Sequence, residues 1–175
     1  MGAAAVKPVL LQVTEIPSPP GPIVFACRGE ALCALCFKEY WPVLIRELKR
    51  RFGSFDIRPD PDGGEPGRAL RRYFKGNFDA LDDVRVHTAG TPFQERVWAN
   101  LRKIPAGRTL SYAELAKSIG RPSAVRAVGG ANGRNPVSIV VPCHRVIAAD
   151  GTLGGYGGGL ERKRWLLVHE GAILA

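Results

Sequence analysis

The chain has 175 residues, of which 45% are apolar and 23% are charged. This composition can supply a hydrophobic core and excludes a largely disordered protein. No apolar run approaches the roughly 18 residues of a membrane-spanning helix, and residues 1–8 lack the basic and apolar regions of a secretory signal. Four cysteines are too few for a disulfide scaffold. We therefore expect a soluble intracellular protein with reduced thiols, located in the cytoplasm or, in a eukaryotic host, in the nucleus.

The net charge of +9 is concentrated in the second half of the chain. Residues 1–88 contain 13 basic and 11 acidic side chains, whereas residues 89–175 contain 12 basic and 5 acidic ones. This asymmetry favours an anionic partner for residues 89–175, with nucleic acid as the first candidate. A basic surface that only keeps the protein in solution is the alternative.

The first half is predicted to begin with an antiparallel sheet. Val9–Ile16, 23–27 and Ala31–Phe37 are rich in apolar residues and are separated by turn residues, which is the pattern of three strands in a meander. Trp41–Phe52 is predicted to be a helix, because its apolar residues recur at helical spacing. Residues 54–58 are a candidate for a further strand.

A loop and a short helix complete the first half. Residues 59–66 are rich in Pro, Gly and Asp and predict a loop, and residues 67–75 predict a short basic helix. No motif with an evident chemistry occurs in this half. We therefore expect residues 1–88 to form an α/β scaffold domain, an antiparallel sheet plus helices, and residues 89–175 to form a mostly helical second domain.

The second half contains three predicted helices in succession. Thr91 is a candidate N-cap for a helix over residues 92–104, and Ser111 caps a helix over residues 112–119. A third helix is predicted over residues 123–131, after a short turn that contains Gly and Pro. The last two helices match a helix-turn-helix, although many unrelated helical bundles contain such a corner.

The third of these helices has unusually small side chains. Two adjacent glycines cost such a helix roughly 1 kcal/mol each relative to alanine, and Arg126 is its one charged residue. A close approach of the backbone to a partner surface would explain the composition, and so would tight packing against a neighbouring helix. The small residues are Ala124, Ala127, Gly129, Gly130 and Ala131.

A Cys-His pair follows a run of branched apolar residues. Residues 137–141 predict a buried strand that Pro142 ends, so that Cys143 and His144 lie in the following turn. At the usual cysteine pKa near 8.5 only about 3% of a thiol is ionised at pH 7, and a histidine beside it can act as the base that raises this fraction. On the dipeptide alone, a buried structural cysteine is the commoner case.

The segment Pro142-Cys-His-Arg-Val146 resembles the active-site signature of the O6-alkylguanine-DNA alkyltransferases, also called methylated-DNA–protein-cysteine methyltransferases. Further segments agree with that family in order and spacing, and together they extend over the whole second half. The first half resembles the variable N-terminal domain of the family only faintly, which implies a ribonuclease H-like scaffold. The further segments are Ser111-Tyr112, Arg126-Ala-Val-Gly-Gly-Ala131, Gly133-Arg-Asn-Pro136, Gly154-Gly-Tyr-Gly-Gly158 and His169-Glu-Gly171.

The resemblance implies direct reversal of DNA damage without a cofactor. An alkyl group, mainly methyl, moves from O6 of guanine, and from O4 of thymine, to Cys143 in one irreversible turnover. His144 then acts as a base through a water molecule, and Glu170 orients it. Tyr112 donates a proton to N3 of the leaving guanine, and Asn135 holds the turn beneath the helix pair against the active-site loop.

The resemblance also implies a mode of DNA binding. The partner is double-stranded DNA that contains O6-alkylguanine, and the protein binds it as a monomer through the minor groove. The target base is flipped out of the stack, and Arg126 fills the gap. The further DNA-binding residues that the resemblance implies are Tyr112, Ser123, Ala127, Gly130 and Ala131. The base pocket that it implies is lined by Val146, Tyr156 and Gly157.

Other functions remain open on the sequence. Cys33 and Cys36 have the spacing of a metal-binding pair, but no second pair of ligands lies nearby, so we expect them and Cys27 to lie in the core and expect no metal. Asn132 and Ser138 depart from the more apolar residues of some relatives, which bears on the size of alkyl group that fits. A non-catalytic sensor of alkylated DNA and a Cys-His hydrolase are the alternatives to alkyl transfer.

Overall fold

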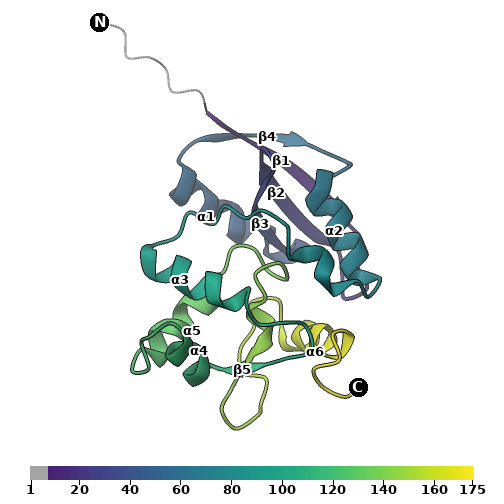
Figure 1. Ribbon diagram of the computed structural model, residues 1–175. Coiled ribbons are helices and arrows are strands. Elements are labelled where there is room, and N and C mark those ends of the chain that lie inside the picture. Colours follow the sequence, from purple (N-terminus) through teal and green to yellow (C-terminus); the bar gives the residue numbers. More distant parts are fainter. Residues whose placement is uncertain (1–7) are drawn as a thin grey trace, which may run out of the picture.

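The computed structural model describes residues 8–175, and Figure 1 shows a sheet with its helices above a mostly helical second half. The prediction that no secretory signal is present concerns residues 1–8, of which 1–7 lie outside the described residues. Within the described part, no helix is both long and apolar enough to cross a membrane.

The sheet has four strands in the order β3-β2-β1-β4. β1 (Val9–Ile16), β2 (Ile23–Arg28) and β3 (Ala31–Phe37) pair antiparallel, as predicted. β4 (Phe55–Pro59) pairs parallel with β1, so the prediction of a purely antiparallel sheet is wrong at this strand. The reason is the helical connection α1 (Trp41–Phe52), which returns the chain so that β4 runs in the same direction as β1.

The last helix of the first half begins earlier than predicted. The 3-10 helix η1 (Lys38–Tyr40) precedes α1, and the 3-10 helix η2 (Phe78–Leu81) follows α2 (Gly64–Phe74). The predicted loop over residues 59–66 is therefore wrong at its last three residues. Gly63, with φ of 70°, provides the left-handed turn before the helix, and a proline is tolerated in the first turn because that N–H has no helical partner.

Two of the three predicted helices of the second half have the predicted caps, whereas the third begins two residues later than predicted and has no side-chain cap. Thr91 forms a capping box at the start of α3 (Pro92–Leu101), which ends three residues before the predicted limit. A capping box at Ser111 likewise opens α4 (Tyr112–Ser118). The other elements are α5 (Val125–Gly133), the 3-10 helix η3 (Cys143–Arg145), α6 (Leu160–His169), and the short parallel strands β5 (Leu110–Ser111) and β6 (Val146–Ile147).

The predicted strand over residues 137–141 is wrong. Val137 makes a single bridge to Leu35 of β3, and the chain then turns through Ile139, whose φ is 72°. The branched apolar residues of this segment are buried as predicted. They are buried in a turn, because the Asn135 side chain bonds the backbone at both ends of the segment and closes it.

The two faces of the sheet are covered differently. One face packs against α1 and contributes to a small cluster that includes Cys33 and Leu48. The other face contributes to the main core, which joins residues of the sheet such as Phe25 to residues of the second half such as Trp98. The division into domains at residues 88 and 89 stays a prediction, since this core contains side chains from both parts.

The three cysteines of the first half are buried in or beside these clusters, as expected. Cys27 belongs to the main core, Cys33 to the small cluster, and Cys36 is 8% exposed. Burial raises the pKa of Cys27 to about 11 and the pKa of Cys33 and Cys36 to about 12, so these thiols stay protonated. Among residues 8–175, no group of three or more His, Cys, Asp or Glu side chains is arranged to hold a metal ion.

Candidate active site

Cys143 lies at the start of η3, in a turn that its neighbours hold closed. Its N–H donates to the carbonyl of Val141 (2.8 Å), and the thiol side chain is nearly inaccessible, the residue being 6% exposed. The Asn135 side chain donates to the same carbonyl (2.7 Å) and accepts from the N–H of Val137 (2.9 Å). Asn135 therefore fastens the turn that carries Cys143.

The surroundings of the Cys143 thiol act on its acidity in opposite directions. Burial raises its pKa, whereas the Asn135 side chain, the charge of Lys163 and the backbone N–H groups of residues 143 and 144 lower it. The result is a pKa above the ordinary value, so the resting thiol is neutral. A base within reach is needed before the sulfur can act as a nucleophile.

His144 can act as that base. Its ring is fully buried, and Nε2 lies 2.9 Å from Oε1 of Glu170. An ionised carboxylate only accepts hydrogen bonds, so Nε2 carries the proton and donates it to Glu170, and Nδ1 presents a lone pair. Nδ1 is buried and has no protein partner. Burial lowers the pKa of His144 although Glu170 opposes the shift, so the ring is neutral and able to accept a proton.

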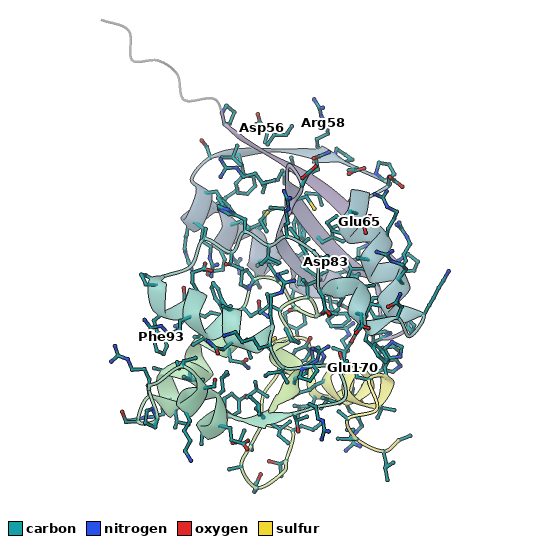
Figure 2. All side chains as sticks on the ribbon, in the orientation of Figure 1. Asp56, Arg58, Glu65, Asp83, Phe93 and Glu170 are labelled. Carbon is teal, nitrogen blue, oxygen red and sulfur yellow. The ribbon has the colours of Figure 1, made fainter. Side chains whose placement is uncertain are left out.

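Glu170 follows the last residue of α6 (Figure 2) and holds several partners at once. Arg145 donates from Nε to Oε2 (2.9 Å) and from Nη2 to Oε1 (2.8 Å). The hydroxyl of Tyr73, on α2, donates to Oε1 (2.7 Å). Burial alone would raise the pKa of Glu170, but His144 and Arg145 outweigh it and hold the pKa well below its ordinary value. Glu170 is therefore a buried, fully paired anion.

Lys163 of α6 is a buried cation on the other side of the Cys143 turn. Its Nζ donates to the carbonyls of Val146 (2.6 Å), Leu153 and Gly155 (3.3 Å), so its three N–H groups are all used. Burial lowers its pKa to about 8, and the nearby Cys143 opposes the shift. Lys163 thereby fixes residues 153–159, called the glycine-rich loop below, against β6.

Three residues of this site were not predicted from the sequence as site residues, namely Arg145, Lys163 and Tyr73. A buried arginine needs a carboxylate, so the position of Arg145 directly after the Cys-His pair could have indicated a role. Lys163 stands between Arg162 and Arg164 in the sequence, so nothing local distinguishes it as the buried cation of the three. Tyr73 is 97 residues from Glu170 in the sequence, and nothing local signals that contact.

Tyr112 and Tyr156 are half-buried aromatic residues near the thiol. Burial and the neighbouring Cys143 raise the pKa of both, while the Asn132 side chain partly opposes the shift at Tyr112. Asn132 also donates to the Cys143 carbonyl (3.4 Å), which is a contact that the sequence did not indicate. Both phenols therefore stay protonated as possible donors.

The two other residues that were predicted to line the base pocket differ in exposure. Val146 is fully buried, and Gly157 is exposed. A methyl group added at Gly154 would lie 3.6 Å from Oη of Tyr112, so the glycine-rich loop approaches the ring closely. A cavity of about 570 Å³ borders the turn at Pro142 and Arg145, but its lining contains none of the predicted pocket residues.

The structure places most of the predicted DNA-binding residues of α5 on its outer surface. Arg126, Ala127, Gly130 and, just before the helix, Ser123 are exposed. Ala131 is different, because it is 3% exposed and its carbonyl accepts a hydrogen bond from Nε1 of Trp98. The structure therefore brings Ala131 into the core and not onto the outer face.

Comparison with known proteins shows which family the chain is similar to. Residues 92–172 match the family described as "6-O-methylguanine DNA methyltransferase, DNA binding domain". The chain is 46% identical to a methylated-DNA–protein-cysteine methyltransferase of Shigella flexneri, with 91% of this chain and 95% of that protein covered. It is 52% identical to the protein of the same name from Methanosarcina acetivorans, with 89% and 95% covered.

Solved structures give the same result. The structure of Mycobacterium tuberculosis OGT in complex with DNA matches with a TM-score of 0.78 and 43% identity over 92% of this chain and 93% of that one. The O6-methylguanine-DNA methyltransferase of Pyrococcus kodakaraensis matches with a TM-score of 0.66 and 28% identity, with 92% and 99% covered. By sequence and by fold, the chain belongs to the family of methylated-DNA–protein-cysteine methyltransferases.

Proposed function

We propose that the protein repairs alkylated DNA directly, by moving the alkyl group from O6 of guanine to Sγ of Cys143. The observation that carries the proposal is the buried thiol next to a neutral histidine, whose Nε2 donates a hydrogen bond to the ionised Glu170. An S–C bond forms as the C–O6 bond breaks, and the electron pair of that bond passes into the guanine ring. The thioether is not reversed, so each molecule reacts once.

The intact mass of the protein tests this proposal. After incubation with a duplex that contains one O6-methylguanine, we expect the mass of one methyl group in place of a hydrogen. An unchanged mass in protein that binds the duplex would contradict alkyl transfer and favour a non-catalytic sensor. Repeated turnover of an ester or peptide would favour a hydrolase.

His144 would accept the proton of Cys143. Its Nδ1 has no protein partner and carries the lone pair, and a single water molecule can pass the proton between the two side chains. Glu170 then stabilises the imidazolium that forms, as the acid partner of a catalytic triad does. The raised pKa of the resting thiol suits this order of events, because the thiolate forms when the base takes its proton.

Tyr112 would protonate N3 of guanine as the base leaves. Its raised pKa keeps the hydroxyl protonated at physiological pH, and its position at the first residue of α4 places it beside the thiol and the glycine-rich loop. A leaving guanine that takes a proton need not depart as a bare anion.

Replacing Tyr112 by phenylalanine should slow the transfer by about 100-fold, at the lower end of general-acid contributions. DNA affinity should stay unchanged, since the ring remains. Single-turnover rates and fluorescence-anisotropy binding curves on the same duplex measure the two effects. Tyr40→Phe, at an exposed tyrosine of the first half, is the matched control. A variant that binds poorly but transfers at the normal rate when saturated would contradict the donor role.

The protein would bind duplex DNA through the helix pair α4 and α5. The exposed face of α5 is made of small side chains around Arg126, which suits a minor groove about 6 Å wide. The excess of basic residues in the second half supports phosphate contacts. Because O6 of guanine faces the major groove, a protein bound in the minor groove can reach it only when the nucleotide is flipped out, and Val146, Tyr156 and Gly157 would receive the base beside Cys143.

Replacing Arg126 by alanine should lower the transfer rate from duplex DNA about tenfold even at saturating DNA, because nothing then fills the gap that the flipped base leaves. The reaction with free O6-benzylguanine should be unchanged. Arg121→Ala removes the same charge from the exposed turn before α5 and is the matched control. It should weaken affinity but not the saturated rate. Equal losses on duplex and free base would contradict base flipping by Arg126.

Three finer points belong to the same proposal. O4-alkylthymine would be a second substrate, and the mass assay with a duplex that contains O4-methylthymine tests it. The protein would act as a monomer, since one chain supplies all the residues named above. It would act where the DNA is, in the cytoplasm of a bacterial cell or the nucleus of a eukaryotic one.

A further inference from the structure

Glu170 has one more hydrogen-bond partner than its ion pair and its histidine require. Oε2 accepts from Arg145, whereas Oε1 is shared between Arg145, His144 and the hydroxyl of Tyr73. The Tyr73 contact, at 2.7 Å, is the shortest of the four. It is also the one that comes from the first half of the chain, which was predicted to be a scaffold without chemistry.

The aromatic side chains around Tyr73 hold its ring rigidly. The ring is fully buried and packs edge-on against Phe74, Phe78 and His169, with centroid distances of 5.1, 5.8 and 5.4 Å. Nε2 of His169 also donates to the Tyr73 carbonyl (3.0 Å). The hydroxyl therefore points at Glu170 from a fixed position, and little conformational entropy is lost when it forms the bond.

The hydroxyl acts on Glu170 as a neutral donor. Burial, and then the charge of Glu170, raise the pKa of Tyr73 well above its ordinary value, so it stays protonated over the whole working range of pH. A donor on Oε1 withdraws part of the negative charge that would otherwise act on the N–H of His144. Tyr73, on α2, thereby limits the strength of the interaction between His144 on η3 and Glu170 after α6.

We propose that Tyr73 is a positioning residue of the alkyl transfer, which orients the Glu170 carboxylate and limits how strongly it holds the proton of His144. This inference rests on the proposed function of His144 as the base. It also implies that the first half of the chain completes the active site. The titratable and charged groups that face His144, Glu170 or Tyr73 are Cys143, Arg145, Tyr156, Lys163 and His169.

The variant Tyr73→Phe tests the proposal, since it keeps the packed ring and removes the hydroxyl. With Oε1 shared only between His144 and Arg145, the imidazolium of His144 is stabilised, and the acid limb of the pH–rate profile should move to higher pH by about 0.5 to 1 unit. A shift of this size corresponds to the net free energy that one hydrogen bond contributes. Single-turnover transfer rates measured between roughly pH 5 and 9 give the position of the acid limb, because this range includes the pH values at which a histidine titrates.

A matched control separates positioning from general loss of stability. Thr14 is buried in β1, and its hydroxyl donates to the Asp60 carbonyl (2.6 Å) and not to Glu170. Thr14→Val also removes one hydroxyl bond of the first half and should lower stability without moving the acid limb. An acid limb that stays in place in Tyr73→Phe, or that moves equally in Thr14→Val, would overturn the proposal.

A second measurement does not depend on transfer activity. The chain has three histidines, so the ¹⁵N spectrum of selectively labelled imidazoles is simple, and His144→Asn identifies the His144 signals. We expect the Nε2 resonance of His144 to move in Tyr73→Phe and to stay in Thr14→Val. An unmoved His144 resonance would refute the role of Tyr73 while leaving alkyl transfer untouched, whereas absence of transfer in the wild-type protein would refute the proposed function instead.

Discussion

Replacing Cys143 by alanine is expected to abolish alkyl transfer completely. The acceptor atom is removed, and the phenols of Tyr112 and Tyr156 cannot replace it at neutral pH, since both stay protonated. The substitution is small, so the turn that Asn135 fastens should remain and duplex binding should be unchanged. Intact mass and binding anisotropy, measured on one preparation, check both halves of this expectation.

The other three cysteines provide the controls. Cys27, Cys33 and Cys36 are as buried as Cys143, but their thiols lack an adjacent base and their pKa values are raised to about 11, 12 and 12. Each should therefore be replaceable by alanine with full retention of transfer. A methylated Cys143→Ala protein would show that another residue accepts the alkyl group and would contradict the assignment of Cys143 as the acceptor.

Burial alone thus does not distinguish the reactive cysteine from the structural ones. Cys143 differs in having a neutral imidazole next to it, a cation at Lys163 and an amide at Asn135, of which the last two lower its pKa. The sequence shows the first of these directly, as the Cys-His pair. The amide lies eight positions before the cysteine and is recognisable through the resemblance, whereas the lysine on α6 becomes a neighbour only in the fold.

Local signals predicted the elements that local interactions determine. The strands β1 and β3, the helix α1 and the caps of α3 and α4 lie where alternation, helical spacing and capping residues indicated. The prediction of a strand over residues 137–141 was wrong, because branched apolar residues indicate burial and not the conformation of the backbone. The turn there depends on the side chain of Asn135, whose two backbone partners no periodicity reveals.

The small residues of α5 bear on the two interpretations that the sequence left open. A methyl group added at Gly129 would meet the ring of Tyr112 at 3.8 Å, which is an ordinary van der Waals contact, so packing inside the protein does not require glycine there. Gly130 is exposed, and an added methyl group there would meet only the guanidinium of Arg134 at 3.6 Å. Close packing against a neighbouring helix therefore explains neither glycine, and the surface that we propose for DNA is the remaining interpretation.

Replacing Glu170 by glutamine is expected to lower the free energy of unfolding by about 3 kcal/mol, as when one partner of a buried ion pair is removed. Arg145 would be left as a buried cation, and an amide N–H₂ would face donors at His144, Arg145 or Tyr73. Urea unfolding at pH 7 measures the loss. Glu161→Gln, an exposed position at the start of the same helix, is the control and should change stability by less than about 0.5 kcal/mol.

The pH dependence of stability separates loss of the ion pair from loss of packing. The folded pKa of Glu170 lies below its ordinary 4.5, so its contribution is present above that pH and is lost as pH falls towards the folded value. The folded pKa of His144 lies below its ordinary 6.5, so unfolding takes up a proton below pH 6.5 and stability falls there too. The wild-type unfolding free energy should therefore decline below about pH 6.5 and more steeply below about 4.5. Glu170→Gln should lose the steeper part, whereas a curve that is only displaced downward, with its slope intact, would show that Glu170 acts through packing and not through its charge.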